Sequence, residues 1–270
     1  MGLNQGDTDF SIFSFDLQSG ILGISSGNLA NNLIVNHLFD ELKGLIPTTT
    51  VIDSVLPNPV EIGQSYSVMA TVSSSSGAPV GTIAIDDGLG NSCNFPAPSG
   101  QCSLPATQLG TPNITANFSG VGNFVGSSAN SSVQITQAST TTSITNISPN
   151  PATVGNLYTV TASVSGFGIP GGNIIVSDGL GMSCQITLPA TSCDLSSVNT
   201  GPRTISASYS GDTNNLPSAT NTNFTVIAAA STTSIDMINP SPSIVGSPYD
   251  VLASVSGFGV PTGTIMVDDG

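Results

Sequence analysis

The sequence has almost no positive charge. Lysine and arginine together number 2, against 16 aspartates and glutamates, so the formal net charge is -14. Phosphate backbones and anionic lipid headgroups repel a chain of this charge. We therefore expect no nucleic acid partner, and the search for function turns to proteins and glycans.

The groups needed for catalysis are equally scarce. The chain has 1 histidine, His37, and its other basic side chains are Lys43 and Arg203. A nucleophilic triad needs a base beside its nucleophile. Because His37 lies far from every motif described below, we expect no catalytic residue, no cofactor and no enzyme activity in residues 48–270.

Long apolar runs and tryptophan are missing too. No stretch of 18 apolar residues occurs, so the sequence predicts no transmembrane segment. Met1 is followed by Gly-Leu-Asn-Gln-Gly-Asp, which is not a basic and then apolar signal segment. We expect this chain to be an internal piece of a longer, exported protein.

What the sequence does contain is a repeat. Pro57-Asn58-Pro59 recurs as Pro149-Asn150-Pro151 and as Pro240-Ser241-Pro242, at offsets of 92 and 91 residues. Glycine, tyrosine and Asp-Gly positions follow the same register, and a fixed period indicates a repeat architecture. We divide the chain into an N-terminal segment (1–47), copy 1 (48–138), copy 2 (139–229) and an incomplete copy 3 (230–270). Gln137-Ala138-Ser139 and Ala228-Ala229-Ala230 are the expected linkers.

The pattern within each copy predicts β-strands. Apolar and polar residues alternate along 158–165 and 66–72, the period of a half-buried strand. About seven such runs, separated by Gly, Pro, Asn and Asp, match an immunoglobulin-like sandwich. The expected fold class is all-β, in tandem sandwiches. Proline cannot donate to a ladder, so the Pro-Asn-Pro element should end the first strand and let the chain change sheets.

The four cysteines form two equally spaced pairs, Cys93 with Cys102 and Cys184 with Cys193. Duplicated spacing favours one disulfide per copy over a zinc site, and disulfides indicate a compartment outside the reducing cytosol. We interpret each pair as lying on one hairpin, with Pro98 or Pro189 at the turn. This arrangement would differ from antibody domains, whose disulfide joins the two sheets.

Residues 48–270 resemble the bacterial Ig-like domain repeats of large surface proteins. The resemblance rests on Thr-Thr-Thr before Pro-Asn-Pro, on the Asp-Gly-Leu-Gly to Ser-Cys hairpin, on Leu-Pro-Ala-Thr-Ser-Cys and on Tyr209-Ser210-Gly211-Asp212. It implies a surface-exposed or extracellular protein. Copy 1 departs from it, with Phe118-Ser119-Gly120-Val121 at the last motif, so a role of Asp212 is not general to the array. Copy 3 stops before its cysteines, and we expect the natural protein to continue.

The first 47 residues follow a different pattern. Residues 6–16 alternate and lead to a turn at Gln18-Ser19-Gly20, which predicts a β-hairpin. Residues 6–27 also resemble one blade of a lactonase-type β-propeller. Apolar residues at helical spacing predict a short amphipathic helix at about 31–43.

Acidic residues precede glycine at equivalent positions of the three copies. Two interpretations are open for these residues, a hard-cation site such as calcium or a plain Asp-Gly turn, and the turn is favoured. The candidates are Asp86, Asp87, Asp178, Asp268 and Asp269.

The favoured function is a non-catalytic spacer or adhesion stalk whose partner is an unidentified surface protein or glycan. One alternative is the C-terminal tail of a β-propeller enzyme or ligand-binding protein. The other is a carbohydrate-binding module, against which the absence of tryptophan argues.

Overall fold

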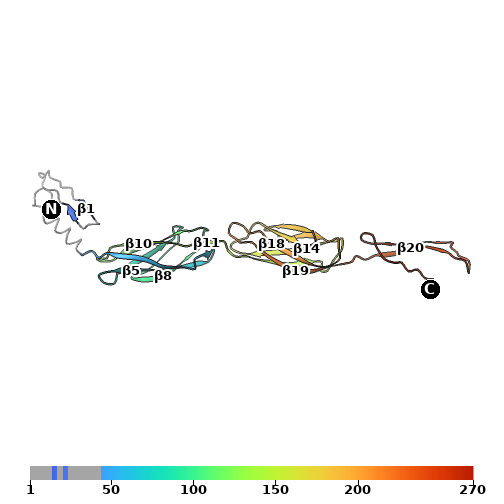
Figure 1. Ribbon diagram of the computed structural model, residues 1–270, viewed down its shortest axis with the longest axis horizontal. Coiled ribbons are helices and arrows are strands. Elements are labelled where there is room, and N and C mark those ends of the chain that lie inside the picture. Colours follow the sequence, from blue (N-terminus) through green and yellow to red (C-terminus); the bar gives the residue numbers. More distant parts are fainter. Residues whose placement is uncertain (1–13, 17–20, 24–43, 270) are drawn as a thin grey trace, which may run out of the picture.

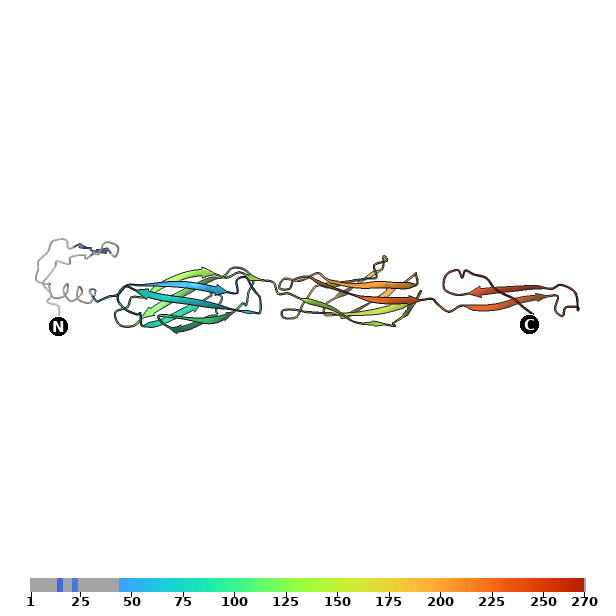
Figure 2. The same cartoon turned by 60° about the horizontal axis from the view of Figure 1, so that its bottom comes forward.

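The computed structural model describes residues 14–16, 21–23 and 44–269. All regular structure in these ranges is β-strand, as the alternation predicts. Two β-sandwiches follow one another along a single long axis, and a two-stranded hairpin comes after them (Figures 1 and 2). The expected all-β fold of tandem sandwiches is confirmed.

Copy 1 is built from a three-stranded sheet and a four-stranded sheet that face each other. The first has the order β3-β5-β8 and the second β10-β9-β6-β7, while a short parallel pair joins β4 to β11. The strands are β3 (Thr48–Leu56), β4 (Val60–Glu61), β5 (Ser65–Ser74), β6 (Gly81–Asp86), β7 (Ser92–Pro96), β8 (Ser99–Pro105), β9 (Asn113–Gly120), β10 (Ser127–Ser132) and β11 (Ile135–Thr136).

Copy 2 repeats this arrangement. Its sheets have the orders β12-β14-β17 and β13-β19-β18-β15-β16, so corresponding strands have corresponding neighbours. Here a single strand, β19, takes the place of β10 and β11. The strands are β12 (Thr141–Ser148), β13 (Ala152–Thr153), β14 (Leu157–Ser165), β15 (Asn173–Ser177), β16 (Ser183–Thr187), β17 (Ser192–Ser196), β18 (Gly201–Tyr209) and β19 (Ser218–Ile227).

Each sandwich encloses its own core. Along β5 the inward positions are fully buried while the polar residues between them are more exposed, and β14 follows the same alternation. Tyr66 and Tyr158 are the largest side chains of the two cores and are each 1% exposed. Sheets whose faces are about 10 Å apart leave room for such interdigitated side chains.

The Pro-Asn-Pro element is where the chain changes sheets. β3 ends at Leu56 and belongs to the sheet of β5, whereas β4 begins at Val60 and pairs with β11. Copy 2 makes the same change between β12 and β13. Asn58 stabilises the crossing, because its Oδ1 accepts a hydrogen bond from the Gln134 amide at 2.9 Å. The predicted crossover is confirmed.

Outside the two sandwiches the described chain forms two hairpins. β1 (Ser14–Asp16) pairs antiparallel with β2 (Ile21–Gly23), which confirms the N-terminal hairpin. The predicted helix at 31–43 lies outside the described residues, as does most of the propeller-like stretch. In copy 3, β20 (Thr232–Asn239) pairs with β21 (Asp250–Ser256). The inward tyrosine of this copy, Tyr249, is 41% exposed, since no second sheet covers it in the described chain.

Candidate functional site

The acidic turn of copy 1 is held together by its own aspartates. Asp87 is 1% exposed, and its Oδ1 accepts the backbone N–H groups of Leu89 at 2.8 Å and Asn91 at 3.1 Å. Its Oδ2 accepts the Asn91 side-chain amide at 2.8 Å and the Tyr66 hydroxyl at 3.3 Å. Four donors therefore surround one carboxylate, which links the turn to the core.

These contacts set the ionisation of the turn. Burial by itself raises the pKa of Asp87, but the hydrogen bonds from Asn91, Leu89 and Tyr66 outweigh it and hold the pKa below its usual value. Burial, followed by the nearby Asp87 charge, raises the pKa of the Tyr66 phenol. At neutral pH the turn thus contains an ionised carboxylate and a protonated tyrosine.

Copy 2 solves the same problem with an arginine. Asp178, the counterpart of Asp87, accepts the amides of Leu180 and Met182 through Oδ1, both at 2.9 Å. Its Oδ2 forms an ion pair of 3.0 Å with Arg203, and both side chains are almost fully buried. Arg203 also donates to the Ser197 hydroxyl and to the Asn199 carbonyl oxygen.

The role of Arg203 was not anticipated from the sequence, although a signal for it exists. Arg203 stands in phase with the inward residues Ile205, Ala207 and Tyr209 of β18, so the alternation places it inside the sandwich. A buried arginine requires an acidic partner. Asp178 is the acidic residue that the fold brings to it.

The other calcium candidates lie on the surface. Asp86 is exposed, and its Oδ1 accepts the Gly88 amide at 2.6 Å. Ser177 replaces it in copy 2 and accepts the Gly179 amide in the same way, at 3.2 Å. Asp268 and Asp269 are exposed. Within 44–269 and the two short described stretches, no three acidic, histidine or cysteine side chains cluster as metal ligands would. We infer that the aspartates hold Asx turns.

The disulfides form within their own copies, Cys93 with Cys102 and Cys184 with Cys193. The expectation that each pair lies on one hairpin is wrong. Cys93 belongs to β7, which pairs with β6, whereas Cys102 belongs to β8, which pairs with β5 in the opposite sheet. Pro98 and Pro189 do lie in the connections, as expected, but there the chain passes from one sheet to the other.

The geometry explains where such a link is possible. The Cα atoms of Cys93 and Cys102 are 6.2 Å apart, well below the roughly 10 Å that separates the faces of packed sheets. β7 and β8 are edge strands of their sheets. A bond of this reach therefore joins the sheets at their shared edge, and each copy resembles antibody domains in linking its two sheets.

The junction between copies 1 and 2 is bonded along the backbone. Ala138 is 6% exposed and packs in the core of copy 1. Its N–H donates to the Asn214 carbonyl oxygen of copy 2, and its own carbonyl accepts the Leu216 N–H, both at 2.9 Å. The expected linker 137–139 is thus part of both modules.

Side chains on either side add polar contacts. Both carboxylate oxygens of Glu61 accept from Ser139, from the hydroxyl at 2.6 Å and from the amide at 3.1 Å. These two bonds lower the pKa of Glu61. Gln137 donates its side-chain amide to the Asp212 carbonyl oxygen at 2.8 Å. The chain between the copies is short and tied down at both ends.

Comparisons with known structures place this architecture among adhesion and fibronectin-like modules. Clostridium thermocellum CbhA fibronectin(III)-like modules are 19% identical, with 66% of this chain and 94% of that chain covered and a TM-score of 0.30. A tetra-tandem repeat in the extending region of a large adhesion protein is 20% identical over 78% and 63% of the two chains, with a TM-score of 0.30. The N-terminal eight Ig domains of Down Syndrome Cell Adhesion Molecule are 16% identical over 71% and 25%, with a TM-score of 0.36. No curated protein matches the chain.

The family assignment comes from a match in sequence. The profile described as Bacterial Ig-like domain (group 3) matches residues 54–136 and again residues 144–227, which together are more than half of the chain. Each match runs from the first strand of a copy to its last, and both disulfides fall within the matched ranges. The chain belongs to the bacterial Ig-like domain (group 3) family, as a tandem array of its modules.

Proposed function

We propose that this chain is a non-catalytic spacer or adhesion stalk of an exported bacterial surface protein. The observation that carries the proposal is the bonded junction, in which Ala138 packs in one module while its backbone pairs with the next. A linker held in this way keeps two sandwiches end to end, which gives reach along one axis (Figure 1). Reach is what a spacer supplies.

Two further features support an extracellular setting. Each complete module contains a disulfide, and such bonds persist in oxidising compartments. The strongly acidic, lysine-poor surface disfavours nucleic acid and anionic membranes. None of the described residues forms a helix capable of crossing a membrane.

The aromatic residues argue for a spacer over a sugar-binding module. Sugar platforms rely on exposed aromatic rings, but Tyr66, Tyr158 and Tyr209 are buried in the two sandwiches. We therefore place adhesion either in another domain of the protein or along the exposed strand faces, where the partner would be a surface protein or a glycan.

The test measures reach on the cell. An epitope tag before residue 1 should be accessible to antibody on intact cells, and deletion of residues 139–229 should bring it closer to the envelope in immunoelectron micrographs. A matched control replaces the deleted module with an unrelated Ig-like module of the same length, which should restore the distance. An inaccessible tag, or a distance that ignores the deletion, would contradict the proposal.

A further inference from the structure

An aromatic ring of copy 2 lies directly on a glycine of copy 1. A Cβ added to Gly63 would come within 2.3 Å of Cδ2 of Phe167, so only glycine fits beneath this ring. Phe167 belongs to the loop after β14, yet it packs against the hydrophobic core of copy 1. The ring therefore serves the contact between the modules.

The next junction repeats the contact. Phe258 of copy 3 lies on Gly155 of copy 2, where a Cβ would come within 2.2 Å of Cε2 of the ring. The polar contacts do not recur, because Thr153 and Ala230 stand at the positions of Glu61 and Ser139. The ring on the glycine is thus the part of the junction that both sites share.

Buried polar side chains hold the Phe167 loop in place. Asn215 is 1% exposed; its Oδ1 accepts the Phe167 amide at 2.7 Å and its Nδ2 donates to the Phe167 carbonyl oxygen at 3.1 Å. Asp212 accepts the other hydrogen of that Nδ2 and also the Gly171 amide at 2.8 Å. Gly166 leaves room for Asn215, since a Cβ there would lie 2.4 Å from Oδ1.

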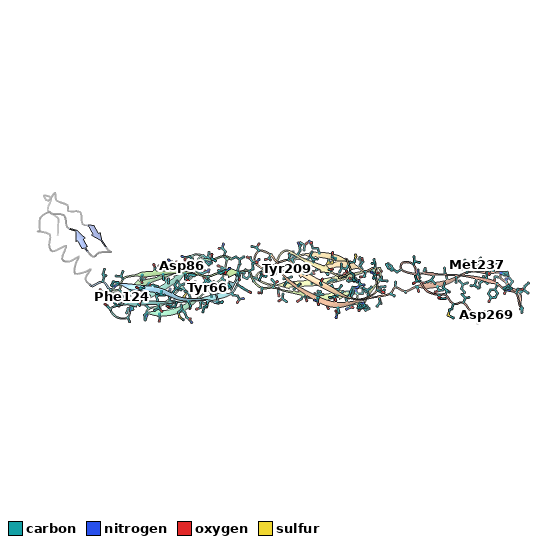
Figure 3. All side chains as sticks on the ribbon, in the orientation of Figure 1. Tyr66, Asp86, Phe124, Tyr209, Met237 and Asp269 are labelled. Carbon is teal, nitrogen blue, oxygen red and sulfur yellow. A yellow bond between two sulfur atoms is a disulfide. The ribbon has the colours of Figure 1, made fainter. Side chains whose placement is uncertain are left out.

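Copy 1 lacks the whole set. Serine occupies the position of Phe167 and Ser74 that of Gly166, while Val121 and Phe124 replace Asp212 and Asn215. The backbone at this end is nevertheless the same, because Ile46 bonds to residues 123 and 125 as Ala138 bonds to residues 214 and 216. Figure 3 shows Phe124 and Tyr209 near the N-terminal ends of their modules. The docking set occurs in the copy that follows another Ig-like module.

The receiving loop has one conformation in all three copies. Gly63, Gly155 and Gly246 have φ values of 86°, 85° and 83°, in the region that favours glycine. Around Gly246 no atom of the described chain lies within 4 Å of an added Cβ. The glycine loop therefore has its shape without a ring upon it, and it is ready-made for docking.

We propose that Phe167, with Asn215 and Asp212 behind it, forms a docking site that recognises the glycine loop of a preceding Ig-like module and fixes the angle between the two. The partner of this surface is a module of the same family, read through a ring on a glycine α-carbon. Phe258 provides the same contact in copy 3, and copy 1 cannot dock in this way. The inference rests on the proposed spacer function, since a fixed angle is what makes a chain of modules stiff.

The experiment compares residual dipolar couplings of copies 1 and 2 in the full chain. In the unmodified protein, amides of both copies should fit one alignment tensor. Phe167→Ser, which installs the residue type of copy 1, should abolish the common tensor while the amide spectrum of copy 2 stays folded. Ile169→Ser is the matched control, because Ile169 lies in the same loop and is 92% exposed, and it should keep the common tensor.

Gly63→Ala provides an independent variant on the other module, and its Cβ should separate the tensors by striking the ring. Gly246→Ala has the same backbone conformation without the ring and reports the effect of backbone strain alone. A common tensor retained in both Phe167→Ser and Gly63→Ala would overturn the docking site and leave the spacer function standing. Unrelated tensors in the unmodified protein would overturn the stiff spacer itself. Should Phe167→Ser unfold copy 2, Gly63→Ala decides.

Discussion

Replacing Arg203 by methionine should destabilise copy 2 selectively. The side chain is 7% exposed and is paired at 3.0 Å with the buried carboxylate of Asp178. Removing one partner of a buried pair costs about 3–5 kcal/mol, because the other charge is left without compensation. Asp178 keeps two amide donors on Oδ1, so only Oδ2 loses its partner. We expect a loss of about 2–4 kcal/mol in the free energy of unfolding.

The assay is urea and thermal unfolding with each copy monitored through its own amide resonances. For a domain of this size the loss corresponds to a midpoint lower by about 10–25 °C. Copy 1 has Pro112 at the equivalent position and should unfold as before. Asp178→Asn combined with Arg203→Met should recover part of the loss, since asparagine still accepts the two amides. A change in copy 2 below about 0.5 kcal/mol would refute the reasoning.

Three other outcomes follow from the structure. In copy 2, burial raises the pKa of Asp212 but hydrogen bonds from Gly171, Asn214 and Asn215 lower it further, to about 2, from a model-compound value of 3.8. Its stabilisation is complete above the unfolded pKa and is lost as pH falls from about 4 to about 2, by at most about 2 kcal/mol; acid titration of Asp212→Asn should show a flatter curve, and an unchanged one contradicts this. Replacing both Cys93 and Cys102 by serine should cost copy 1 about 2–3 kcal/mol in urea unfolding, with copy 2 as the internal control. Residues 245–256 should exchange amide hydrogens fastest in the repeat region, and the chain should scatter more light than one ending at Ala229, because the face of β21 is uncovered; equal protection and equal scattering would argue against it.

The local features were predictable because they depend on short-range chemistry. Alternation assigned the inward residues of β5 and β14, and the prolines marked the change of sheet, since a residue without an N–H cannot continue a ladder. The cysteine spacing indicated which cysteines pair. It could not indicate the sheets they join, because a separation of nine residues suits a hairpin and a crossing between sheet edges equally well.

By itself, the sequence determined the repeat, the fold class, the two disulfide pairs and the lack of catalytic groups, all of which depend on residue type and period. Only the tertiary structure decided which side chains from distant positions meet. Arg203 with Asp178, Asn215 with Phe167 and Phe167 with Gly63 are separated by 25, 48 and 104 residues. Their contacts arise from how the sheets pack and how one module stands on the next. Periodicity assigns a residue to a face, and packing alone selects the partner that the face meets.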